Sequence, residues 1–121
     1  MNFLLVMPKG LGKSPGGYNI FPVGIAYISA YLKGHNFKVI TSNLEYHPET
    51  TQQLLKSLIE ENDIDVICTS GLSRDFPKVK EIVDASRKIK PDIIAVIGGG
   101  LITGDPEPAM TALDADIGVI G

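Results

Sequence analysis

The feature that most constrains this chain is an alternation of short, continuously apolar runs with longer segments of helical period. Apolar runs of this length fit central parallel strands, which are covered on both faces and carry no polar side. The predicted strands are residues 2–7, 37–41, 64–69, 93–97 and 117–120. The predicted helices run from Pro22 or Val23 to Gly34, through 54–59, from Phe76 to Ile89, and from Asp105 to Leu113. This alternation predicts repeated βαβ units.

The order of these elements predicts the fold. Crossovers between parallel strands are right-handed, so the helices fall on both faces of the sheet. We therefore expect a doubly wound, Rossmann-like (flavodoxin-like) α/β domain with three α/β/α layers and five parallel strands in the order 2-1-3-4-5. The helix at 22–34 is apolar nearly all round, which requires cover on more than one side. Because this fold ordinarily adds a fifth helix, we expect residues 1–121 to be one domain, an N-terminal fragment of a longer protein.

Composition narrows the class of partner. The chain has 44% hydrophobic and 21% charged residues and a formal net charge of −3, which are ordinary values for a folded soluble domain. It lacks the Lys/Arg cluster that binds phosphate backbones or anionic lipids, so we expect neither nucleic acid nor a membrane as a partner. The apolar run at 1–7 is too short for a signal peptide or a membrane span, and we expect a cytoplasmic protein.

Any ligand site is expected at one edge of the sheet. In open α/β sheets, ligands bind beyond the carboxyl ends of the strands, where the connecting loops converge. The loops in question are 8–21, 42–47, 70–75 and 98–104, together with Gly121. Three of them are rich in glycine or hydroxyl residues. Such loops let a large ligand approach the backbone, or they merely turn the chain, and the sequence leaves both interpretations open.

Three familiar patterns do not match this sequence. The stretch 10–14, Gly-Leu-Gly-Lys-Ser, resembles a phosphate-binding loop, but that pattern requires glycine where Met7 stands. A dinucleotide fingerprint fails at Pro15, which occupies its last glycine position. A phosphorylatable receiver domain would need an acidic pair after the first strand, where the chain has Pro8 and Lys9.

Catalytic groups are sparse. Neither His35 nor His47 has a carboxylate or nucleophile at a spacing that predicts pairing, so we expect both on the solvated surface. Asp75 and Asp105 stand where helix N-caps are expected. The one cysteine, Cys68, lies in an apolar strand and is expected to pack in the core. We expect no catalytic residue and no metal ligand in these residues.

Several motifs together resemble one family. They are Met7-Pro8 after the first strand, Phe21-Pro-Val-Gly-Ile-Ala-Tyr-Ile28, Asp65-Val-Ile-Cys-Thr-Ser70, Val96-Ile-Gly-Gly-Gly100 and the closing Ala115-Asp-Ile-Gly-Val-Ile-Gly121. In this order and spacing, over nearly the whole chain, they resemble the cobalamin-binding domain that precedes the barrel of many radical-SAM enzymes. That family includes methyltransferases acting on unactivated carbons and enzymes related to magnesium-protoporphyrin ester oxidative cyclases.

The resemblance implies a cobalamin site. Ser70-Gly71-Leu72 and Gly98-Gly99-Gly100 match by position the residues that border the nucleotide tail in related domains. On this basis we expect cofactor contacts at Lys9, Gly10, Asn43, Ser70, Gly71, Leu72, Gly98, Gly99 and Gly100. The histidine ligand motif Asp-x-His-x-x-Gly is absent after the first strand, where Lys9 and Lys13 stand instead, and a protonated lysine has no lone pair for cobalt. A tail-out cofactor without a histidine ligand, or a domain that has lost cobalamin, are the two implied alternatives.

The resemblance also implies that cobalamin binding and catalysis lie in different domains of one protein. The fragment would supply the cobalamin-binding half of a methyl transfer from S-adenosylmethionine to a substrate carbon, and would show no catalysis alone. S-adenosylmethionine and a 4Fe-4S cluster would belong to a downstream radical-SAM domain of the same chain, because its three-cysteine motif is absent here. The alternatives are a non-catalytic flavodoxin-like interaction or regulatory domain and, less well matched, a flavin-binding domain, for which the loop at 9–17 offers one hydroxyl, Ser14.

Overall fold

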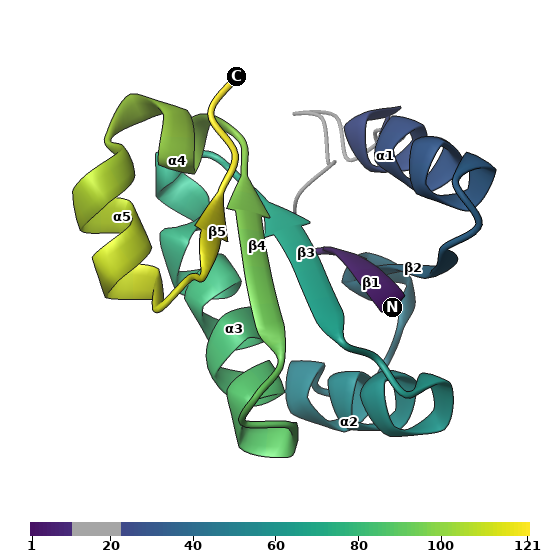
Figure 1. Cartoon of the computed structure of the whole chain (residues 1–121). Coiled ribbons are helices and arrows are strands. Elements are labelled where there is room, and N and C mark those ends of the chain that lie inside the picture. The colour runs from purple at the N-terminus through teal and green to yellow at the C-terminus, as the bar shows by residue number, and fades with distance from the viewer. Residues whose placement is uncertain (11–22) are drawn as a thin grey trace.

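The computed structural model describes residues 1–10 and 23–121. Along the chain its elements are β1 (Asn2–Met7), α1 (Val23–Gly34), β2 (Lys38–Asn43), the 3-10 turn η1 (Leu44–Tyr46), α2 (Thr51–Asn62), β3 (Val66–Ser70), the 3-10 turn η2 (Ser73–Asp75), α3 (Phe76–Ile89), β4 (Ile94–Gly98), α4 (Gly100–Gly104), α5 (Pro106–Leu113) and β5 (Ile117–Gly118). All neighbouring strands pair in parallel, in the order β2-β1-β3-β4-β5 (Figure 1). The predicted fold class and strand order are confirmed.

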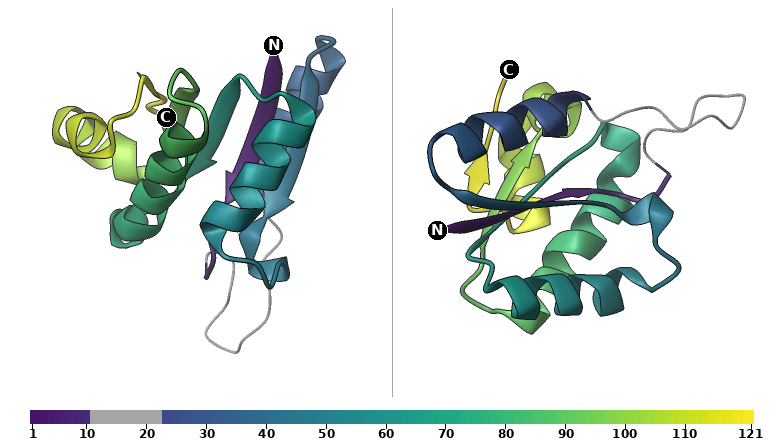
Figure 2. Two further views of the ribbon diagram at one scale, coloured as in Figure 1. Left: turned by 90° about the horizontal axis from the view of Figure 1, so that it is seen from below. Right: turned by 90° about the vertical axis from the view of Figure 1, so that its right-hand side faces the viewer.

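The helices divide unequally between the two faces of the sheet. The right-hand view in Figure 2 places α1 on one side and α2 and α3 on the other. One apolar core fills the α2–α3 side, where side chains of β1, β3 and β4 meet those of α2, α3, α4 and α5. Its fully buried members include Leu4, Leu55, Ile67, Ile82 and Ile97. Burying each such side chain contributes about 1.5–3 kcal/mol, so this side carries most of the stability.

Helices α2 and α3 form where local signals and apolar period agree. Helix α2 begins with a capping box in which Thr50 Oγ1 accepts from Gln53 N–H, while Gln53 Oε1 accepts from Thr50 N–H. Helix α3 turns Val79, Ile82 and Val83 to the sheet and ends at Ile89, two residues before Pro91, as predicted. Replacing Ile82 by alanine would leave a cavity and cost about 2–5 kcal/mol.

Three local predictions need correction. The loop after β4 contains a short helix, α4, because Leu101 and Ile102 turn into the core. Strand β5 is two residues long, although Val119 N–H still donates to Ile97 O at 2.8 Å. Asp105 precedes α5 without a side-chain capping bond.

Asp75 occupies the N-cap position of α3, as predicted, but its side chain bonds elsewhere. Its Oδ2 accepts from Leu72 N–H at 2.8 Å, so the carboxylate closes the turn η2 and makes no capping bond to α3. The side chain is buried, at 5% exposure. It therefore stabilises the loop that follows β3.

Strand β5 is fastened by one arginine. Arg87, near the end of α3, donates to Ile93 O and Asp114 O and pairs with the Asp116 carboxylate at 2.8 Å. Asp116 also accepts from Ala95 N–H at 2.7 Å. These bonds lower the pKa of the Asp116 carboxyl, the backbone bond most strongly.

Candidate functional site

The carboxyl edge of the sheet brings two of the predicted segments together. Ser70, the last residue of β3, pairs in register with Gly98, the last residue of β4. The loops that follow remain in contact, since Leu101 N–H donates to Gly71 O at 2.9 Å. Ser70 to Leu72 and Gly98 to Gly100 thus form one continuous surface.

The glycines of this surface differ in what an added Cβ would contact. A Cβ added at Gly99, whose φ is +85°, would lie 2.8 Å from Gly71 O and 3.1 Å from Gly71 N. A Cβ at Gly71 would lie 2.9 Å from Asp75 Cβ, and one at Gly100 would lie 3.0 Å from Leu72 Cδ2. At these three positions the chain's own atoms explain the absence of a side chain.

Gly98 is the exception. A Cβ added there would meet nothing nearer than Val119 Cβ at 3.7 Å, which is ordinary van der Waals contact. Its backbone is also free of positive φ. Neither packing nor conformation requires glycine at Gly98, which lies beside Ser70 in register and has Val119 as its nearest neighbour.

A row of side chains crosses the α1 face of the sheet at this point. Leu5, Cys68, Val96 and Ile117 are successive register partners on β1, β3, β4 and β5. Leu5 is 1% exposed, Cys68 and Val96 are half-buried, and Ile117 is 51% exposed. The cover decreases along the row because α1 packs on β1 and β2, at the other end of the sheet (Figure 1).

Pleating places Ser70 and Gly98 on the same face as this row. Side chains alternate along a strand, so Cys68 and Ser70 share one face of β3, opposite the buried Ile67. We call the set Cys68, Ser70, Val96, Gly98 and Ile117 the open strip. Cys68, Val96 and Ile117 make one apolar row, and the Ser70 hydroxyl lies next to it, nearer the carboxyl edge of the sheet. No described residue forms a hydrogen bond with Ser70 Oγ.

Cys68 is less deeply placed than predicted. It is half-buried on the open strip, with a free thiol. Burial raises the pKa of this thiol to about 11. At neutral pH the group is an uncharged, weakly reactive side chain, and it suits contact with an apolar ligand.

The remaining predicted contacts lie elsewhere on the edge. Lys9 Nζ donates to Glu49 O at 2.9 Å, and Gly10 N–H donates to Glu45 Oε2 at 2.7 Å. Asn43 Oδ1 accepts from Glu45 N–H at 3.0 Å and caps η1. These three residues bond to Glu45 or Glu49, after β2, whereas Ser70 and Gly98 are the last residues of β3 and β4. Lys13 lies outside the described residues, as does Ser14 of the flavin alternative.

One expectation about the histidines is wrong. His47 has neighbours of the kind the spacing excluded: its Nε2 lies 3.4 Å from Ser42 Oγ and its Nδ1 lies 3.9 Å from Glu49 Oε2. The second distance exceeds a hydrogen bond, so the three groups do not form a proton relay. His35 is exposed, as predicted, and its ring packs on Tyr31 with centroids 4.3 Å apart.

Within residues 1–10 and 23–121, no group of three His, Cys, Asp or Glu side chains is placed to hold a metal ion. No helix in those ranges is long and apolar enough to cross a membrane.

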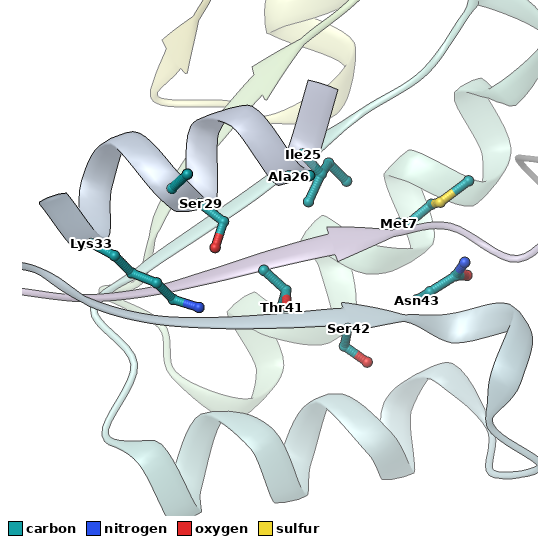
Figure 3. A pocket seen from close by; sticks show the side chains of 9 residues that line it. Met7, Ile25, Ala26, Ser29, Lys33, Thr41, Ser42 and Asn43 are labelled. Carbon is teal, nitrogen blue, oxygen red and sulfur yellow. The ribbon is translucent and has the colours of Figure 1, made fainter. Parts of the chain in front are cut away.

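A cavity of about 420 Å³ lies between α1 and β2. Of the predicted contacts, Asn43 alone lines it, and the other lining residues are Met7, Ile25, Ala26, Ser29, Ala30, Lys33, Thr41 and Ser42 (Figure 3). It is therefore separate from the open strip.

The strand order and the helices on both faces define a doubly wound α/β domain, and the open strip reaches the carboxyl edge of its sheet. Among solved structures, the radical S-adenosylmethionine methyltransferase TsrM from Kitasatospora setae, with cobalamin and a [4Fe-4S] cluster bound, matches with a TM-score of 0.79 at 19% identity. The match covers 98% of this chain and 22% of TsrM, so this chain spans about a fifth of that protein. A CheY-like protein, tadZ of Pseudomonas aeruginosa PAO1, matches with a TM-score of 0.66 at 16% identity, over 98% of this chain and 87% of that one.

These likenesses establish the fold, and the sequence establishes the family. The family described as the B12 binding domain matches residues 13–121. The chain therefore belongs to the B12-binding domain family, as the motifs predicted. No curated protein matches its sequence.

The open strip fits such a cofactor. A nucleotide tail needs an apolar bed for its aromatic base and a polar contact at one end. The half-buried Cys68 and Val96 would provide the first, and the Ser70 hydroxyl, in register with Gly98, would provide the second.

Proposed function

We propose that this chain is the cobalamin-binding module of a radical-SAM enzyme that transfers a methyl group from S-adenosylmethionine to a substrate carbon. The observation that carries the proposal is the open strip, whose apolar row becomes more exposed toward β5 and adjoins Ser70 and Gly98 at the carboxyl edge. Family membership and the likeness to the cobalamin domain of TsrM support it. When bound, cobalamin supplies a cobalt atom that can carry a methyl group.

In this proposal the residues of the chain bind and orient. Ser70 Oγ donates to the nucleotide tail, Gly98 leaves room for it, and Cys68 and Val96 pack against its base. Gly71, Gly99 and Gly100 shape the two loops through their contacts with the chain itself. The loop after β1 brings no imidazole in residues 8–22, so we propose a cofactor without a histidine ligand.

The methyl transfer reaction itself is assigned to a further domain of the same protein. That domain would hold S-adenosylmethionine and the 4Fe-4S cluster. Its proposed docking region is the uncovered part of the α1 face. There Tyr27, Ile28 and Tyr31 of α1 are 75%, 51% and 68% exposed, and Ile117 of β5 is 51% exposed. The first helix was predicted to need cover on more than one side, and its outer side has none among the described residues.

The test is retention of hydroxocobalamin by the purified chain after size separation, read by the visible spectrum. Wild type should retain the cofactor with a base-off spectrum, since no histidine is proposed to replace the base. Ser70→Ala should lower retention, whereas the exposed control Ser57→Ala on α2 should not. Retention that is equal in all three proteins would count against the open strip as the site.

A second candidate is a flavodoxin-like interaction domain that has lost cobalamin. It is favoured by the contacts of Gly71, Gly99 and Gly100, since internal packing alone accounts for these glycines. Absence of retention at high micromolar cofactor, both in this chain and in the full-length protein, would select this alternative.

A further inference from the structure

The cavity between α1 and β2 has features of a second ligand site. It encloses about 420 Å³, which falls within the roughly 300–1,000 Å³ typical of small-molecule pockets. It lies over β2, separated from β3 and β4 by β1, so it is distinct from the open strip. Its apolar wall is formed by Met7, Ile25, Ala26 and Ala30.

The Ser29 hydroxyl lines this cavity and faces its open space. Ser29 is 7% exposed, the one buried residue of α1, and no described residue forms a hydrogen bond with its Oγ. Figure 3 shows the Ser29 hydroxyl pointing from α1 into the space above β2. A hydroxyl that faces the cavity and has no bond within the described residues is available to donate to a ligand there.

Two further donors converge on the same space. The Lys33 side chain extends from the last turn of α1 over β2, and no described residue pairs with its ammonium group (Figure 3). Thr41 projects from the α1 side of β2, whereas the Ser42 hydroxyl is directed to the opposite side, toward His47. None of the nine residues that line the cavity is acidic.

We propose that this cavity binds a small carboxylate with an aliphatic body. The carboxylate accepts from Ser29 Oγ, Thr41 Oγ1 and Lys33 Nζ, which together supply one positive charge and suit a monoanion. The aliphatic body packs against Met7, Ile25 and Ala26. A phosphate dianion would require a second cation, which the lining residues do not provide.

The test is a titration of the ¹⁵N-labelled chain with sodium octanoate, followed by amide chemical shifts. Shifts should cluster at Ser29, Lys33 and Thr41. Lys33→Gln should weaken binding by about fivefold, the effect of one exposed charge-assisted contact. Ser29→Ala should weaken it by roughly threefold to tenfold, the effect of one hydrogen bond.

Matched controls keep the result specific. Lys56→Gln and Ser57→Ala change the same residue types on α2, on the other side of the sheet, and should leave octanoate binding unchanged. Octanol has a similar body without the charge and should bind more weakly. The proposal is overturned if octanol binds as tightly, if Lys33→Gln has no effect, or if the shifts centre on Tyr27 and Tyr31. Hydroxocobalamin binding at Ser70 is measured separately, so either proposal can fail alone.

Discussion

Substituting two adjacent glycines, Gly98 and Gly99, would separate the structural from the ligand-binding role of the loop after β4. Gly99 has φ 85° and ψ −176°, a region that residues with a side chain rarely enter, at a cost of about 1–3 kcal/mol. An alanine Cβ would also lie 2.8 Å from Gly71 O, a backbone atom that cannot rotate away. Relieving such overpacking costs about a further 1–3 kcal/mol.

Gly99→Ala should therefore lower the free energy of unfolding by about 2–6 kcal/mol. In a domain of this size each kcal/mol lowers Tm by roughly 4 °C, so the melting temperature should fall by roughly 8–24 °C. Thermal and urea unfolding followed by far-UV circular dichroism would measure both quantities. A Tm within about 3 °C of wild type would refute the argument that the Gly71 contact requires glycine at Gly99.

Gly98→Ala is the matched control. Its Cβ has room, and alanine restricts the unfolded chain, so stability should stay equal or rise by about 0.4–1 kcal/mol. The methyl group would project beside Ser70 on the open strip, and hydroxocobalamin retention should fall. A variant that is stable and retains the cofactor as well as wild type would place the tail elsewhere.

Three further measurements address the rest of the molecule. The folded Asp116 carboxyl has a lowered pKa, so its stabilising effect is full above the unfolded pKa and is lost as the pH falls through the folded pKa. Asp116→Asn should cost about 1 kcal/mol at neutral pH and reduce the loss of stability on acidification, measured by urea titration at several pH values. Cys68 alkylation by iodoacetamide should accelerate about tenfold per pH unit up to a pKa of about 11, and bound hydroxocobalamin should slow it. Ile82→Ala should destabilise by about 2–5 kcal/mol in the same urea assay, and a smaller loss would mean that the core relaxes into the cavity.

The fold could be predicted because the apolar pattern identifies the strands and helices, and their order along the chain limits how the strands can pair. The apolar run at 2–7 and the four later apolar runs can be parallel strands covered on both faces. Right-handed crossovers between such strands then allow few strand orders. Helix α4 was missed because Gly100 and Gly104 favour a loop, and only tertiary burial of Leu101 and Ile102 makes the segment helical. Tertiary packing overrides local propensity there.

The site was predictable in part. The pairing of Ser70 with Gly98 follows from strand order, since the ends of neighbouring parallel strands meet at one edge. Glycine spacing does not reveal which atoms lie opposite each glycine. The close approach of Gly99 to Gly71 O could therefore not be predicted from the sequence. The approach of Ser42 to His47 also escaped prediction, because the turn η1 bends the chain back over five residues.

The gradient of exposure across the α1 face has a consequence for how a ligand enters. Leu5 is sealed beneath α1, whereas Ile117 at the far strand is half open, so access to the row is from the β5 side. The row is apolar, and Ser70 lies beside it, nearer the carboxyl edge of the sheet. A ligand with an apolar part and a polar part would therefore place the apolar part along Cys68 and Val96 and the polar part at the loops. Because a covering segment from the β5 side would close the same entrance, ligand and cover should stabilise each other by burying one another's apolar surface.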